Sequence, residues 1–123
     1  MKKLLLLLAF FSFQFVNAQT SDEKEYSPTF PGGIDSMYAF IEKNMKNPAL
    51  AKDSINEVKV MLRFAIMTDG KVDKIEVLSK TPKQFNEEAV RVFQLMPKWI
   101  PGMQYGRPVT IYFTIPIVFN YNK

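Results

Sequence analysis

A segment near the end of the chain alternates between apolar and mostly polar side chains over eleven residues, 109–119, which is the pattern of a half-buried β-strand. Pro116 lies within this pattern. Proline has no backbone N–H and cannot donate a hydrogen bond to a neighbouring strand, so it is confined to the unpaired side of an edge strand. We therefore predict that this strand lies at the edge of a sheet. The residues on its apolar face are Val109, Ile111, Phe113, Ile115, Ile117 and Phe119.

The position of Pro116 also identifies the open side of the predicted edge strand. Successive backbone N–H groups point to opposite sides of a strand. Thr110, Tyr112 and Thr114 therefore turn theirs to the same side as Pro116. An unpaired edge of this length is normally an aggregation hazard, so we expect that it is either covered or paired with a partner strand.

A rigid corner precedes this strand. The only tryptophan of the chain, Trp99, lies between Pro97 and Pro101 and is followed by Gly102. Proline fixes φ and glycine permits tight turns, so these four residues are predicted to form a structural corner that sets the direction of the last strand. We expect Trp99 to pack in the core at this corner rather than to stack on a ligand.

Two helices are predicted from apolar residues at helical spacing. The first follows the sequence PGG and covers 34–45. The second covers 82–96, with Thr81 as its N-cap, Pro82 in its first position and Gln84 completing a capping box.

Two further strands lie between these helices. Alternation from 57 to 66 indicates a half-buried strand, and Asp69 and Gly70 then favour a hairpin. The second strand of the hairpin, 71–79, changes phase near Asp73, where we expect a bulge. The order α-β-β-α-β predicts an α+β fold, a three-stranded antiparallel sheet with two helices packed on one face.

The first 18 residues have the features of a secretory signal peptide, with two lysines, a predominantly apolar run and the sequence Val-Asn-Ala before the cleavage site. The apolar run, 4–16, is shorter than the about 17–25 residues that a membrane-spanning helix needs. We therefore expect cleavage rather than a retained anchor, and no integral membrane segment after cleavage. The mature chain would comprise a disordered leader, 19–29, and one domain, 30–123.

The composition argues against catalysis and against nucleic-acid binding. The chain has no histidine and no cysteine, which removes the commonest general base, a common metal ligand and a ready nucleophile. We predict no enzyme activity, no cofactor and no metal site. Without the two lysines of the signal segment, 14 basic residues stand against 12 acidic ones. A net charge of +2 on an exported domain does not indicate a nucleic-acid partner.

The order of the elements and several short sequences resemble the C-terminal domain of TonB, especially the forms found in Bacteroidetes-type bacteria. The resemblance spans about residues 28–121, and its most specific part is MPKWIPG followed by GRPV and TIPIVF. The sequences that carry it are FPGG before the first helix, NPA after it, DGKV in the hairpin, EEAVRVFQLMPKWIPG from the second helix into the corner, and GRPVTIYFTIPIVF as the last strand.

This resemblance implies a periplasmic protein-binding module. In that family the domain pairs its last strand with a short segment, the TonB box, of TonB-dependent outer-membrane receptors. It passes on force from a proton-driven motor in the inner membrane and so serves energy-dependent transmembrane transport. Carried over to this chain, the pairing edge comprises Arg107, Val109, Thr110, Ile111, Tyr112, Phe113, Thr114 and Ile115, with Gln104 and Tyr105 as a candidate rim.

The chain differs from the full family architecture ahead of the domain. That architecture has an uncleaved transmembrane helix and a long proline-rich spacer. Here we expect a cleaved signal and a leader of eleven residues, which reaches only about 36 Å when extended. A soluble adaptor or competitor without a force-transducing role is therefore an alternative. A homodimer formed by pairing the open edges of two copies is another.

Overall fold

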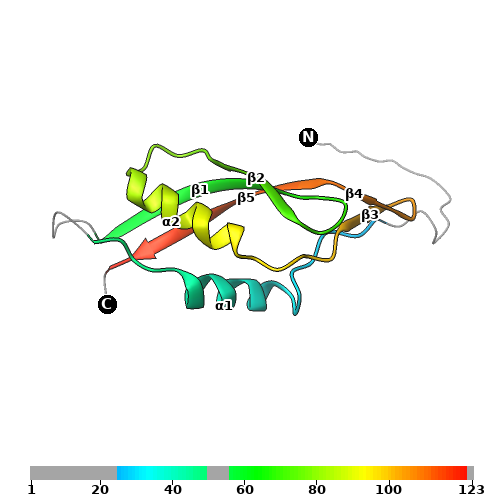
Figure 1. The fold of residues 1–123 in the computed structure, drawn as a ribbon, viewed down its shortest axis with the longest axis horizontal. Helices are drawn as coiled ribbons and strands as arrows, with labels where there is room; N and C mark the ends of the chain where they lie inside the picture. Colours follow the sequence, from blue (N-terminus) through cyan, green and yellow to red (C-terminus); the bar gives the residue numbers. More distant parts are fainter. Residues whose placement is uncertain (1–24, 50–55, 122–123) are drawn as a thin grey trace, which may run out of the picture.

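Two helices pack on one face of an antiparallel three-stranded sheet, and a small hairpin extends from one end (Figure 1). The computed structural model describes residues 25–49 and 56–121, so the predicted signal peptide lies outside the described residues. The predicted fold class is confirmed, and the hairpin β3–β4 is an addition. The elements are α1 (Ile34–Asn44), β1 (Glu57–Ile66), β2 (Val72–Val77), α2 (Lys83–Gln94), β3 (Gly102–Gln104), β4 (Arg107–Val109) and β5 (Ile111–Asn120).

β1 is the central strand of the sheet. The strand order is β2-β1-β5, and both pairings are antiparallel. β5 pairs with β1 over its whole length, from Asn120 opposite Glu57 to Ile111 opposite Ile66. The alternation of β1 predicted one apolar face, and that face is buried against the helices: Val58, Val60, Leu62, Phe64 and Ile66.

β2 is shorter than predicted and carries the expected bulge. Its register with β1 shifts between Asp73 and Glu76, where Lys74 and Ile75 lie opposite a single residue of β1. Lys74 has a positive φ of 52°. An extra residue of this kind bends a strand and increases its twist, so the edge formed by β2 is irregular while that formed by β5 is regular.

The helices cover the apolar face of the sheet. α2 buries four side chains at the spacing of one helical stripe, and α1 contributes Met37 and Ile41 to the same core. The ring centroids of Phe93 and Phe64 lie 4.8 Å apart, which joins α2 to β1. The four buried residues of α2 are Phe85, Ala89, Val92 and Phe93.

The predicted capping of α2 is wrong, and both helices end one or two residues before their predicted limits. Pro82 keeps an extended ψ of 146° and is itself the N-cap residue, without a side-chain hydrogen bond. Thr81 is therefore one residue too far from the free N–H groups of the helix to form a capping box with Gln84. Its C=O instead accepts a hydrogen bond of 2.9 Å from Asn86 Nδ2.

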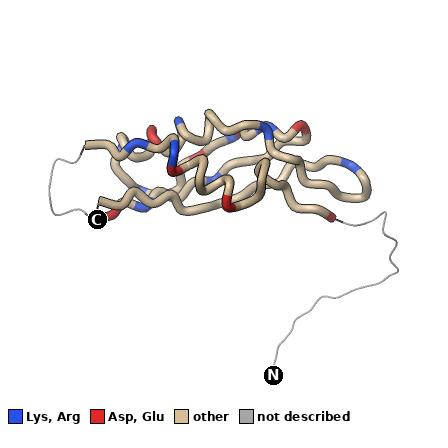
Figure 2. The backbone as a smooth tube through the Cα atoms, turned by 90° about the horizontal axis from the view of Figure 1, so that it is seen from below, with Lys and Arg blue, Asp and Glu red and all other residues tan. Residues whose placement is uncertain are grey.

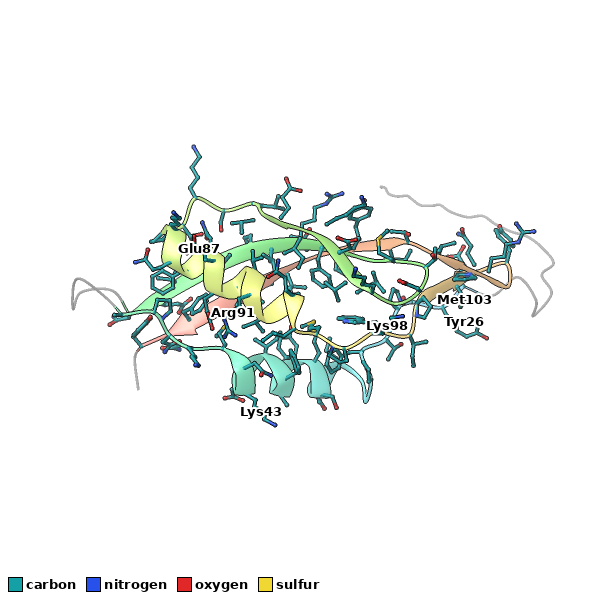
Figure 3. The ribbon with its side chains drawn as sticks, in the orientation of Figure 1. Tyr26, Lys43, Glu87, Arg91, Lys98 and Met103 are labelled. Carbon is teal, nitrogen blue, oxygen red and sulfur yellow. The ribbon has the colours of Figure 1, made fainter. Side chains whose placement is uncertain are left out.

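A polar clamp joins the end of α1 to α2. Glu88 Oε2 accepts the backbone N–H of Lys46 at 2.7 Å, and the two carboxylate oxygens accept bonds of 2.8 and 2.7 Å from Arg91. Arg91, which lies between the helices in Figure 3, also donates to the C=O of Asn44 at 2.8 Å. The hydrogen bonds from Arg91, together with that from the Lys46 N–H, hold the pKa of Glu88 below its usual value.

We predict that Glu88→Gln lowers the free energy of unfolding by about 1–2 kcal/mol at neutral pH, because a carboxylate that is only 13% exposed loses its charge-assisted hydrogen bonds. The folded-state pKa of Glu88 lies below the unfolded value of 4.5. The stabilisation by its charge is therefore complete above that value and is lost as the pH falls through the folded-state pKa. Urea unfolding at neutral and acid pH measures both effects, and the difference between the two proteins should shrink in acid.

Glu87→Gln is the matched control for this measurement. Glu87 is exposed and lies 3.8 Å from Lys83 in an i, i+4 pair, so its replacement should change the free energy of unfolding by less than about 0.5 kcal/mol. Equal losses in the two variants would show that the clamp does not stabilise the fold.

Candidate functional site

β5 forms an edge of the three-stranded sheet, as the position of Pro116 predicted. Among the described residues, β1 is the only strand bonded to β5. Pro116 lies opposite Met61, whose N–H donates to Ser79 Oγ at 3.0 Å and whose C=O accepts the N–H of Leu78 at 2.8 Å. Met61 thus uses both backbone groups on the side of β2. Pro116 therefore faces away from β1, and its missing N–H interrupts no bond of the sheet.

The alternation of backbone groups along a strand also tells which residues of β5 bond to β1 and which face away from it. Just beyond the strand, the Tyr121 N–H donates to the C=O of Asn56 at 2.8 Å, so odd-numbered residues bond toward β1. Even-numbered residues turn their backbone groups the other way. We call these groups the open row; they belong to Tyr112, Thr114, Pro116 and Val118.

The predicted strand is wrong at its beginning, because the chain first forms a separate hairpin. Tyr105 and Gly106 have positive φ angles of 52° and 75°, which fits a two-residue hairpin turn. This turn folds β4 back onto β3 and places Val109 opposite Gly102. Gly102, predicted as part of the corner, is thus a strand residue, and Thr110 lies between β4 and β5.

A second proline, Pro108, lies on the hairpin and, like Pro116, faces away from the strand with which it is paired. Pro108 is opposite Met103, which exchanges two backbone hydrogen bonds of 2.9 Å with Tyr26 on the other side of β3. Pro108 therefore faces away from β3. Seven residues, 109–115, separate two positions that cannot donate, and they span about 23 Å in extended conformation.

The segment that precedes α1 is hydrogen-bonded to β3 and to the corner. Besides the pair of Tyr26 and Met103, Thr29 exchanges backbone bonds of 2.9 and 2.8 Å with Ile100. The end of the segment that we predicted to be a disordered leader is thus held by hydrogen bonds, and residues 19–24 lie outside the described residues. In the sequence of 19–29, Tyr26 is the only large side chain that could have indicated packing against the domain.

Trp99 is a core residue at the corner, as predicted. Its side chain is 7% exposed, stacks on Phe113 of β5 with centroids 6.0 Å apart, and meets Phe30 edge-on at 5.6 Å. The Trp99 N–H donates to the C=O of Gly70 at 2.8 Å. A Cβ added to Gly70 would lie 2.0 Å from the Trp99 carbonyl oxygen, so the corner and the β1–β2 hairpin approach each other as only glycine permits.

The side chains of Tyr112 and Thr114 alternate with those of Phe113 and Ile115 and lie on the outer face of the sheet, away from the helices. The Tyr112 ring centroid lies 4.2 Å from the guanidinium carbon of Arg63, and Arg63 donates to Glu76 at 3.4 Å. These contacts connect β5, β1 and β2 across the outer face, where the guanidinium meets the π face of the ring.

The predicted rim lies on the hairpin rather than beside β5. Gln104 ends β3 and its Nε2 donates to Glu25 Oε2 at 3.0 Å, while Tyr105 forms the turn and is 64% exposed. Arg107 is opposite Gln104 and is exposed. The structure thus divides the predicted edge residues into two on β4, one connecting residue and five on β5.

The open row offers backbone hydrogen bonding rather than a cluster of reactive side chains. Within residues 25–49 and 56–121, no three His, Cys, Asp or Glu residues are grouped so that they could hold a metal ion. In the same part of the chain no helix is long and apolar enough to span a membrane.

Basic and acidic residues are interspersed along the backbone (Figure 2). The pKa of Asp69 is lowered because its carboxylate accepts the N–H of Lys71, which is a turn contact.

Comparisons with known proteins point to one family. The family model described as Gram-negative bacterial TonB protein C-terminal matches residues 43–121. Two solution structures of the C-terminal domain of TonB from Helicobacter pylori are similar to this chain. The shorter has a TM-score of 0.52 and 23% identity and covers 72% of this chain and 94% of that one. The longer has a TM-score of 0.50 and 26% identity, with coverages of 71% and 78%. No curated protein matches this chain.

We predict that proline is tolerated at Thr114 but not at Ile115. Thr114→Pro removes an N–H that faces the open edge, whereas Ile115→Pro removes one that bonds to β1 and leaves the opposing carbonyl unpaired. Relative to the matching alanine variants, Ile115→Pro should lose about 1–3 kcal/mol of unfolding free energy, and Thr114→Pro less than about 1 kcal/mol. Chemical denaturation of the four variants measures this, and equal losses at both positions would refute the assigned parity.

Proposed function

We propose, because the chain belongs to the family of TonB C-terminal domains, that this protein-binding module docks the TonB box of TonB-dependent outer-membrane receptors. The receptor segment would join the sheet as a fourth strand beside β5. In strand addition, main-chain hydrogen bonds supply affinity, and side chains of alternate residues supply register and specificity.

The open row of β5 is the observation that carries this proposal. Tyr112 and Thr114 turn N–H and C=O groups to a side where no described strand bonds to β5. The opposite edge is less suited to a partner, since β2 bears the bulge at Lys74 and exposes Asp73 and Glu76. Bulges and charges are features that keep edge strands from pairing. An added strand is therefore directed to β5.

The proposed contact extends from Arg107 to Ile115 in two parts. The β5 part, beginning at Ile111, would supply the paired backbone. The β4 part, with Gln104 and Tyr105 at its rim, would meet receptor residues just beyond the paired segment. Thr110 connects the two parts at the point where the chain leaves one small sheet for the other.

In this proposal the mature protein acts in the periplasm after export by its signal peptide and takes part in energy-dependent transport across the outer membrane. A soluble adaptor or competitor would use the same edge without passing on force. Receptor-dependent uptake in cells that lack the protein separates transport from competition, because uptake falls if the protein drives transport and rises if it competes.

A homodimer is the second candidate, since an open edge is complementary to the same edge of another copy. Pairing of two β5 strands would extend the sheet and occupy the open row. A homodimer would be detected as a molecular mass that increases with protein concentration. It would also compete with receptor peptides for the same backbone groups.

The test is an NMR titration of isotope-labelled residues 19–123 with peptides from the plug N-termini of TonB-dependent receptors. We predict saturable shifts concentrated on residues 107–115. Tyr112→Pro should abolish these shifts while the helical circular dichroism stays unchanged, because the N–H that it removes belongs to the open row and not to the bonds with β1. Tyr112→Ala keeps that donor and is the control, which should still bind.

Binding of the peptides by Tyr112→Pro with the affinity of the unaltered protein would place the docking surface elsewhere. An absence of shifts with every peptide, together with a dimer-sized relaxation rate, would favour self-association instead.

A further inference from the structure

Two pockets lie between α1 and β5, and together we call them the groove. The first, which we call the Trp99 pocket, has a volume of about 270 Å³. Apolar side chains from α1, the corner and β5 form most of its wall. They include Ile34, Tyr38, Trp99, Phe113 and Ile115.

The second pocket, which we call the Met45 pocket, continues the groove toward the end of β5 and has a volume of about 290 Å³. Its wall combines α1 with the residues around Pro116. They include Tyr38, Ile41, Met45, Pro116 and Val118. Tyr38 lines both pockets and therefore lies at the division between them.

α1 turns a row of apolar side chains toward the groove without closing it. Ile34, Tyr38 and Ile41 follow one another at the spacing of a single helical stripe, and Met45 is the residue just after the helix. Ile41 is buried, but Ile34 is 65% exposed and Tyr38 is 50% exposed. Large apolar side chains that line an open groove beside unpaired backbone groups mark an interaction site.

We propose that this groove receives alternate side chains of the strand added to β5, so that the module selects an extended peptide with aliphatic or aromatic residues at every second position. The inference rests on the proposed docking function and specifies the ligand. Residues of β5 contribute both to the open row and to the groove walls, so a strand paired with the row lies beside the groove. Every second side chain of that strand then points to the helix side.

The size of the groove fits single side chains. An apolar cavity of about 150 Å³ already admits a benzene ring, so each pocket has room for an aliphatic or aromatic side chain. The intervening side chains of the peptide would lie on the outer face, near Tyr112 and Arg63, where polar residues are favoured. In the proposed contact the paired part of β5, Ile111–Ile115, matches about five residues of the peptide. A heptapeptide adds one residue at each end, so that three of its side chains face the helices.

A single peptide strand suits the groove better than a second copy of the chain. α1 lies beside β5, on the side of the open edge, in Figure 1, and its side chains line both pockets. A two-fold axis that paired two β5 edges would bring the α1 helices of both copies to the same groove. An extended segment without a helix of its own avoids this conflict.

Two capped heptapeptides test the inference, one alternating Thr and Val with Val at positions 2, 4 and 6, and one of threonine only. Both supply the same backbone, and valine and threonine are similar in shape, so only apolar burial differs. Binding is followed by the fluorescence of Trp99, the only tryptophan, and by the amide shifts of Tyr112 and Thr114. We predict that the alternating peptide binds at least about tenfold more tightly and alters the Trp99 emission.

Equal affinities of the two peptides, with shifts at Tyr112 and Thr114, would overturn the role of the groove and leave strand addition standing. The role of the groove would also be overturned if the protein binds receptor peptides but does not bind the alternating peptide. A protein that binds neither the heptapeptides nor the receptor peptides would overturn the docking proposal itself.

Tyr38→Ala probes the groove from the side of the protein. It removes the residue shared by the two pockets, and we expect the preference for the alternating peptide to fall by about tenfold while the weak binding of the threonine peptide stays unchanged. Lys43→Ala is the control on the same helix, since Lys43 points away from the sheet in Figure 3 and lines neither pocket. An unaltered preference in Tyr38→Ala, with an unaltered helical signal, would contradict the inference.

Discussion

The pairing of β5 with β1 is the constraint on which the rest of the structure depends. Two independent features of β5 require the same register. Ile117 and Phe119 must face the helices to be buried, and Pro116 must face away from β1 because it cannot donate. A shift of one residue would turn the apolar face to solvent and place the proline in the ladder. The agreement of these requirements makes the opposite side of β5 an unpaired edge.

The remaining elements hold α1 next to this edge without covering it. Phe30, which precedes α1, contacts Trp99 and the helix residue Phe40, with ring centroids 5.6 and 5.8 Å apart, and so joins the helix to the corner. At the end of α1, Glu88 and Arg91 bond to the backbone that leaves the helix. These contacts hold the helix in place, while its side chains Ile34, Tyr38 and Ile41 line the groove. A groove that exists before a ligand binds spares the cost of ordering it on binding.

The sequence predicts the sheet well because its signals are local. Alternation in β1 and β5 identifies the buried faces, and Pro116 alone identifies the open side of β5. The phase change near Asp73 indicates the bulge for the same reason. Trp99 between two prolines was predicted in the core and is found there, stacked on Phe113.

Other features depend on tertiary context and could not be predicted from the same signals. Val109 and Ile111 continue one alternation, yet the positive φ of Tyr105 starts a hairpin that separates them. The segment before α1 pairs with β3, and the sequence did not predict β3, so this pairing could not be predicted either. The groove arises because α1 lies beside the edge, and nothing in the helical periodicity of Tyr38 indicates this position.

Amide hydrogen exchange along β5 is the most direct test of the central claim, that this strand has a free row of backbone groups for a partner. In the unliganded protein, the amides of Phe113, Ile115 and Ile117 should be protected by β1, while those of Tyr112 and Thr114 should exchange rapidly. Saturation with a receptor peptide should slow the exchange at Tyr112 and Thr114. Uniform protection along β5 in the free monomer would mean that the edge is already covered, and it would contradict the account.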